Sequence, residues 1–143
     1  MARKAVVTGI GIISSLGDNA KEVLTSLKEC KSGISYSEEY AEKGFRSHVY
    51  GMPKIDLNDA LDRKNKRFMG DGAAYNYLSM EEAITDSGLS EEQVSHERTG
   101  LIMGSGGPST RNLIQAADTA RERGPKKVGP FMVPRTMSST NSA

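Results

Sequence analysis

The chain has 143 residues, 36% of them hydrophobic and 26% charged, and its 19 basic and 18 acidic side chains leave a net charge of +1. This length suits one globular domain, and the composition is not that of a disordered chain. The near-neutral charge excludes a nucleic-acid binder that depends on bulk charge, although a local basic patch stays possible.

Few residues are available for redox or metal chemistry. The single cysteine, Cys30, excludes an internal disulfide framework, and the two histidines, His48 and His96, leave little for a metal site. No apolar run of about 18 residues could span a membrane, and the N-terminus lacks the apolar core of a signal peptide. We therefore expect a cytoplasmic protein without a metal ion, a nucleic-acid partner or a membrane partner.

The first predicted element is a short buried strand over Ala5–Ile10. The adjoining Gly9-Ile10-Gly11 is similar to the start of a dinucleotide fingerprint, but Ser14 stands where the third glycine would fall. We expect a tight turn with positive φ here. A nucleotide-binding module built on Gly9-Ile10-Gly11 and on the glycines of 104–107 remains the alternative from another class of function.

A helix follows, with Asn19 as its N-cap, Glu22 at capping-box spacing and Gly33 as its stop. We expect Cys30, near the end of this helix, to be a packing cysteine. The next segment, 35–44, is polar and mixed and predicts an irregular surface excursion.

A short exposed strand is predicted over Arg46–Gly51, and a polar helical turn over Asp59–Lys66. Four of the five residues 63–67 are basic. Such a run is either a solvated face or a docking patch for an acidic partner, since clustered cations create a local potential that the net charge conceals.

A longer helix is predicted from Asp71 until Gly88, and Ser90–Gln93 has the spacing of a second capping box. A second buried strand is expected over Thr99–Gly104, leading into a loop of small residues, and Thr110 is placed to cap a further helix.

The remaining chain is predicted to be mostly irregular. Residues 121–127 hold a second basic cluster, and the apolar segment 129–137 contains two prolines, which favours an extended, packed loop. The small polar residues 138–143 are typical of a helix start.

Two buried strands, each followed by a helix, predict an α/β fold with a parallel sheet. Two such strands and one edge strand are too few for a self-sufficient sheet. We expect residues 1–143 to be the front part of a larger domain, with no complete second domain.

Several segments, in order and over nearly the whole chain, resemble the N-terminal third of the β-ketoacyl-acyl-carrier-protein synthases, and synthase I more than synthase II. They are 5–11, 14–17, 32–34, 46–49, 62–64, 67–69, 78–81, 104–107 and 129–131.

The resemblance implies a thiolase-like, five-layered αβαβα sandwich, incomplete in this chain, in a homodimeric enzyme of fatty acid biosynthesis. The implied reaction is a decarboxylative Claisen condensation of an acyl thioester with malonyl-acyl carrier protein, without a cofactor. It requires a cysteine thiolate, an oxyanion hole and two histidines. Neither Cys30, His48 nor His96 matches those groups, so we expect no catalytic residue here and an inactive chain. Synthase II or a silent chain-length-factor-like subunit remains an alternative.

The resemblance also assigns binding surfaces. Residues implied to dock the acidic acyl carrier protein are Arg63, Lys64, Arg67, Arg123 and Lys126. Residues implied to shape the acyl pocket or the dimer interface are Gly107, Leu113, Phe131, Thr136 and Met137.

Overall fold

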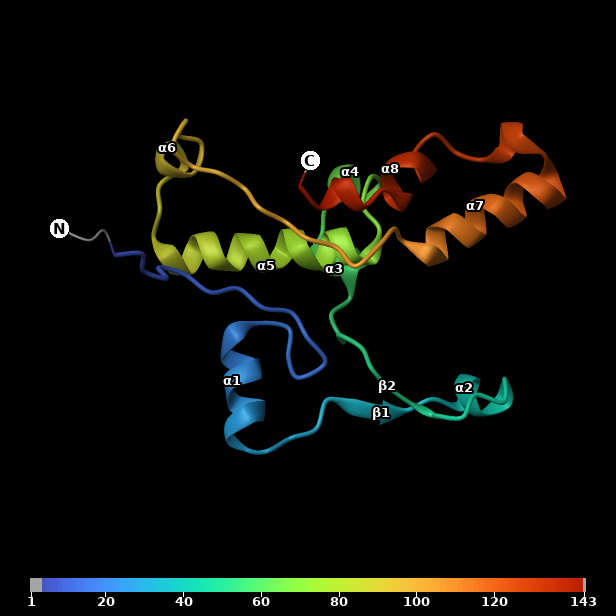
Figure 1. The fold of residues 1–143 in the computed structure, drawn as a ribbon, viewed down its shortest axis with the longest axis horizontal. Helices are drawn as coiled ribbons and strands as arrows, with labels where there is room; N and C mark the ends of the chain where they lie inside the picture. Colours follow the sequence, from blue (N-terminus) through green and yellow to red (C-terminus); the bar gives the residue numbers. More distant parts are fainter. Residues whose placement is uncertain (1–3, 143) are drawn as a thin grey trace. The chain divides into compact units, whose positions relative to one another are not determined.

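The computed structural model describes residues 4–142, and the chain divides into two compact units. The first unit runs to Ile55 and includes Leu78–Leu89, and the second contains Asp56–Tyr77 and the chain from Ser90 onward. The longest helix, α5 (Asp71–Ser87), contributes residues to both units (Figure 1).

In the first unit, the N-terminal segment runs along the C-terminal half of α5. The Ile10 and Ile12 backbone N–H groups donate to the carboxylates of Asp86 and Glu82, each at 2.9 Å. The intervening glycines allow this approach, because a Cβ on Gly11 would lie 1.7 Å from the Ser79 carbonyl oxygen. Neither Gly9 nor Gly11 has a positive φ, so the predicted turn is wrong. Both glycines serve close backbone packing.

Helix α1 (Ala20–Lys28) begins as predicted, since the Asn19 side chain accepts the Glu22 backbone N–H at 2.9 Å. The Glu22 carboxylate accepts the N–H of Asp18 at 2.9 Å, one residue before the N-cap, so the capping box is displaced rather than reciprocal. The helix ends at Lys28, well before Gly33. Cys30 lies beyond it with φ 54° and is exposed, so its prediction as a packing cysteine is wrong.

The segment 35–44, predicted to be irregular, is ordered. Strand β1 (Ile34–Tyr36) pairs antiparallel with β2 (Val49–Gly51), Ser35 opposite Tyr50, and α2 (Glu38–Glu42) lies between them. Ser37 is the reason: its hydroxyl accepts the Tyr40 N–H at 3.2 Å, and its own N–H donates to the His48 carbonyl at 2.7 Å. One buried serine therefore starts α2 and extends the pairing of the two strands.

The two predicted buried strands, 5–10 and 99–104, are wrong as regular elements. Within residues 4–142, β1 and β2 form the one ladder of named strands. Val7 and Ile102, expected to be buried, are 82% and 96% exposed. An apolar extended segment becomes a strand only when a neighbouring strand satisfies its backbone N–H and C=O groups. No other described segment pairs with either one.

The second unit contains the first turns of α5, one further helix of 14 residues and several shorter helices. Asp56 caps α3 and Asp62 caps α4 through backbone N–H bonds, and Ser90 and Gln93 form the predicted capping box of α6. The helices are α3 (Leu57–Ala60), α4 (Arg63–Lys66), α6 (Glu91–Val94), α7 (Thr110–Arg123), η1 (Pro125–Lys127), α8 (Met132–Thr136) and η2 (Ser138–Asn141).

The predicted extended loop over 129–137 is wrong, because α8 forms despite Pro134. Pro134 is the third residue of this helix, where a backbone N–H has no acceptor within the helix, so proline costs no hydrogen bond there.

The core is sparse. Buried apolar side chains are Val23, Leu57, Leu61, Ala73 and Ala74. Large residues such as Val6, Leu101 and Ile114 are more than half exposed. This agrees with the expected incomplete sandwich.

Candidate functional site

The first candidate surface is the α4 basic cluster, defined as Arg63, Lys64, Lys66 and Arg67. Asp62 builds it: one carboxylate oxygen accepts the N–H groups of Lys64 and Asn65 at 2.6 and 3.0 Å, and the other accepts the Asn65 side-chain amide at 2.7 Å. This cap holds a four-residue helix that would not form alone.

Members of the α4 basic cluster differ in what they contact. Lys66 donates to the Asn58 side chain at 2.6 Å, which ties α4 to α3. Arg63, Lys64 and Arg67 are exposed and form no salt bridge with any residue in 4–142. Three unpaired cations therefore share one short segment of a chain whose net charge is +1.

A carboxylate stabilises the start of α3 next to this cluster. The backbone N–H and then the side-chain amide of Asn58 hold the pKa of Asp56 below its ordinary value of 3.8, with a smaller contribution from the Lys66 charge. Lys66 therefore has partners within the fold, whereas Arg63 and Lys64 form no salt bridge with any residue in 4–142.

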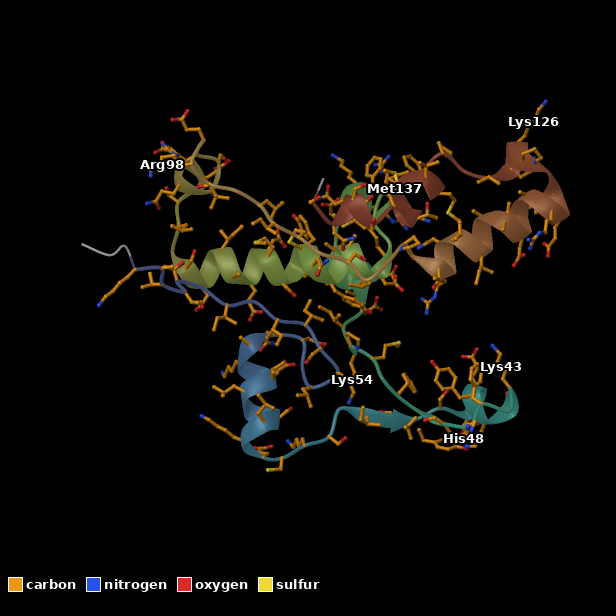
Figure 2. All side chains as sticks on the ribbon, viewed as in Figure 1. Lys43, His48, Lys54, Arg98, Lys126 and Met137 are labelled. Carbon is orange, nitrogen blue, oxygen red and sulfur yellow. The ribbon has the colours of Figure 1, made fainter. Side chains whose placement is uncertain are left out.

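Arg123 and Lys126 belong to a separate surface. Arg123 ends α7 and Lys126 lies in η1, and both are exposed. In Figure 2 the Lys126 side chain projects beyond the C-terminal end of α7, away from Met137. Within the second unit, the five predicted docking residues thus form two patches.

The Gly107 pocket, of about 400 Å³, joins two of the predicted acyl-pocket residues: Gly107 and Met137 both line it. A Cβ on Gly107 would meet no atom within 4 Å, so the missing side chain leaves room there. Its other lining residues are largely polar and include Asp71 and Arg111, which form a salt bridge at 2.9 Å.

The three other predicted pocket residues do not line the Gly107 pocket. Leu113 lies on α7 and is 51% exposed. Thr136 donates its hydroxyl to the Val133 carbonyl at 2.9 Å, within α8. Phe131 packs edge-to-face on Phe68, with ring centroids 5.2 Å apart.

Residues that the sequence analysis did not single out also belong to this surface. Arg135 lines the Gly107 pocket, and its Nε donates to the Arg67 carbonyl at 2.9 Å. Phe68 directly follows the basic run, and that position was the available signal. Its aromatic partner is 63 residues away in sequence, where no local pattern reaches.

The remaining candidate residues stay apart. His48 packs edge-on to Tyr36, with ring centroids 6.0 Å apart, and His96 accepts the Arg98 N–H at 3.1 Å. Among residues 4–142, no three histidine, cysteine or acidic side chains come together as metal ligands. No helix in the same range is both long and apolar enough to cross a bilayer.

The family model for the β-ketoacyl synthase N-terminal domain matches residues 2–143. The chain belongs to the β-ketoacyl synthase family. Against the 3-oxoacyl-[acyl-carrier-protein] synthase 1 of Haemophilus influenzae it is 54% identical, over 99% of this chain and 35% of that protein. Against the synthase 2 of Vibrio harveyi it is 34% identical, over 94% of this chain and 33% of that protein.

Solved structures give the same fold for this β-ketoacyl synthase chain. A β-ketoacyl synthase from Burkholderia phymatum matches with a TM-score of 0.75 and 26% identity, over 96% of this chain and 34% of that one. A ketosynthase solved in complex with a type II polyketide acyl-carrier protein matches with a TM-score of 0.71 and 17% identity, over 95% and 35%. The thiolase-like fold is therefore confirmed, and the chain spans about a third of the length of these relatives.

Close packing against α5 accounts for the glycines that were similar to a dinucleotide fingerprint. Gly9 and Gly11 lie against the backbone of α5, where a Cβ on Gly9 would come within 2.1 Å of the Ala83 carbonyl oxygen. Helix packing fills the space that a pyrophosphate would need at Gly9 and Gly11, and the family match favours a β-ketoacyl synthase over the nucleotide-binding alternative.

Proposed function

We propose that this chain is the N-terminal portion of the N-terminal half of a fatty-acid-elongating β-ketoacyl-acyl-carrier-protein synthase. Such an enzyme condenses an acyl thioester with malonyl-acyl carrier protein by decarboxylative Claisen condensation. The 54% identity to a synthase 1, against 34% to a synthase 2, favours the synthase I branch over synthase II. A cytoplasmic homodimer without a cofactor belongs to this proposal.

Within that enzyme, this chain supplies the docking surface for the acidic carrier protein. The observation that carries this proposal is the α4 basic cluster, in which Arg63, Lys64 and Arg67 are exposed and form no salt bridge within residues 4–142. Unpaired, clustered cations attract an acidic protein and orient it during the encounter. Arg123 and Lys126 form a second patch that extends the same attraction.

The acyl chain is held at the dimer interface, where Gly107 leaves room and Met137 forms the wall. Both line one pocket, which supports this part of the proposal. Phe131, Thr136 and Leu113 then contact the partner protomer or the acyl chain from outside this pocket.

Catalysis is supplied from outside these 143 residues. The reaction needs a cysteine thiolate activated by a neighbouring base, and a backbone oxyanion hole. Cys30, the single cysteine of the chain, is exposed, and the His48 ring packs against the ring of Tyr36. Both residues lie in the first unit. The 143-residue chain alone is therefore expected to be inactive.

Charge reversal in the full-length protein tests the docking surface. Replacing Arg63 and Lys64 with glutamate should weaken binding of purified acyl carrier protein at low salt by about ten-fold or more, with the loss shrinking as NaCl is added. The matched control replaces Lys21 and Lys28, two exposed lysines of α1, because it makes the same change in net charge. Equal binding by the α4 double variant and the wild type would refute the docking proposal.

A further inference from the structure

Arg67 differs from the other two unpaired cations of the α4 basic cluster. Its guanidinium carbon lies 5.7 Å from the Phe68 ring centroid and 5.6 Å from that of Phe131. The two rings meet edge-to-face at 89°. We call these three residues the Arg67 cluster.

Two hydrogen bonds, each from an arginine side chain to a backbone carbonyl, hold Arg67 from both sides. The Arg67 Nε donates to the Lys64 carbonyl at 3.2 Å, which bends the side chain back over α4. The Arg67 carbonyl accepts the Nε of Arg135 at 2.9 Å. Arg67 thus connects α4 to α8 through both its side chain and its backbone.

This geometry favours an arginine over a lysine. A planar guanidinium can lie against aromatic rings while donating from Nε, whereas a lysine ammonium is a compact point charge without such a plane. Arg63 and Lys64 make no cation–π contact with any described ring. We therefore expect them to contribute to carrier binding through their charge.

The α8 end of the connection belongs to the wall of the Gly107 pocket. Arg135 lines that pocket, as does Met137, which directly follows α8. Gly70 packs closely there, since a Cβ on it would lie 2.9 Å from the Arg135 carbonyl oxygen. The position of α4 is therefore defined relative to the pocket wall.

We propose that Arg67 is a positioning residue, which fixes α4 on α8 so that Arg63 and Lys64 meet the carrier protein in one orientation. Arg67 then contributes to the geometry of the docking surface in addition to its charge. This inference depends on the carrier docking proposed above.

The test is Arg67→Lys in the full-length protein, which keeps the charge but removes the guanidinium near both rings and its Nε donor to the Lys64 carbonyl. We expect carrier protein affinity to fall about five-fold, on the scale of two partly exposed cation–π contacts. The dependence of log affinity on log NaCl should keep its slope, because the number of charges is unchanged. Arg98→Lys, the matched control, makes the same change at an exposed arginine outside both basic patches and should bind like the wild type.

A second readout separates positioning from general stability. In Arg67→Lys, KM for the carrier-bound malonyl substrate should rise about five-fold, while kcat is unchanged. KM for a malonyl thioester of a small thiol should also stay unchanged, because that substrate has no carrier protein to bind α4. A rise in KM for both substrates, or a fall in kcat alone, would overturn the inference.

Variants of the aromatic partner keep the inference testable if Arg67→Lys folds poorly. Phe131→Leu removes one ring without touching a charge and should weaken carrier binding, whereas Phe131→Tyr retains the ring and should restore it. The double variant with Arg67→Lys and Phe131→Leu should lose less binding free energy than the sum of the losses of the two single variants.

Two results distinguish the two proposals. If the Arg63 and Lys64 reversal weakens carrier binding but Arg67→Lys and Phe131→Leu do not, the docking surface stands and Arg67 is merely one more charge. If the Arg63 and Lys64 reversal has no effect, carrier docking at α4 is itself refuted.

Discussion

The Glu82 carboxylate holds the N-terminal segment in place through the backbone of Ile12. One oxygen accepts the Ile12 N–H at 2.9 Å, and the other accepts the N–H of Ala20, the first residue of α1, at 2.8 Å. A single side chain of α5 therefore accepts hydrogen bonds from the backbone of the N-terminal segment and from the start of α1.

Removing this carboxylate should destabilise the protein. Glu82→Ala leaves two partly buried N–H groups without acceptors, and we expect a loss of about 1–3 kcal/mol in the free energy of unfolding. Denaturant unfolding of the full-length protein measures it. Glu97→Ala, in an exposed loop, is the control, and an equal stability of both variants would contradict the role of Glu82.

Gly11 should tolerate no side chain. An alanine there would place its Cβ 1.7 Å from the Ser79 carbonyl oxygen of α5, so the segment must move away from the helix. We expect Gly11→Ala to cost about 3 kcal/mol or more, because backbone cannot yield as a side chain can. Gly72→Ala has open space within α5 and should be neutral or slightly stabilising by thermal unfolding. Similar melting temperatures for the two variants would show that the approach is not tight.

Filling the Gly107 pocket should shorten the acyl chains that the full-length enzyme accepts. Gly107→Ile places a branched side chain in the pocket, and we expect rates with the longest acyl donors to fall while rates with the shortest persist. A series of acyl donors of increasing length measures this. Gly106→Ile is the control, because Gly106 also has open space around it but does not line the pocket. Equal rates at all lengths would refute the pocket assignment.

Acid should weaken the start of α1. The Asp18 backbone N–H and then the Asn19 side chain hold the pKa of Glu22 below its ordinary value of 4.5. The unfolded chain then binds the proton more tightly than the folded one, so this contribution to stability is complete above pH 4.5 and disappears as pH falls through the folded pKa. An NMR titration of the Glu22 side chain should give a midpoint below 4.5, and Asp18→Pro, which removes that N–H donor, should raise it. An unchanged midpoint in the proline variant would disprove this cause.

Short-range signals identified most of the helices. The N-caps Asn19 and Ser90 and the stop at Gly88, which has φ 67°, are where the residue types predicted them. Each of these features depends on neighbours within about one turn of helix, so a local pattern contains the necessary information. The basic run at α4 was visible for the same reason, and the resemblance gave the family and fold that the comparisons confirm.

Contacts between residues far apart in the sequence could not be predicted from local patterns. The apolar pattern at Val6 and Val7 indicated a strand but contained nothing about which strand would pair with it, and none of the described residues does. Likewise, two glycines that suggested a turn serve the close approach of α5, and Arg67, one cation among several, lies against Phe131. Composition and local spacing specify which groups a segment offers, because those groups are covalent neighbours. Which groups meet is decided by chain folding, since backbone pairing, close packing and cation–π contact all join residues that only the tertiary structure brings together.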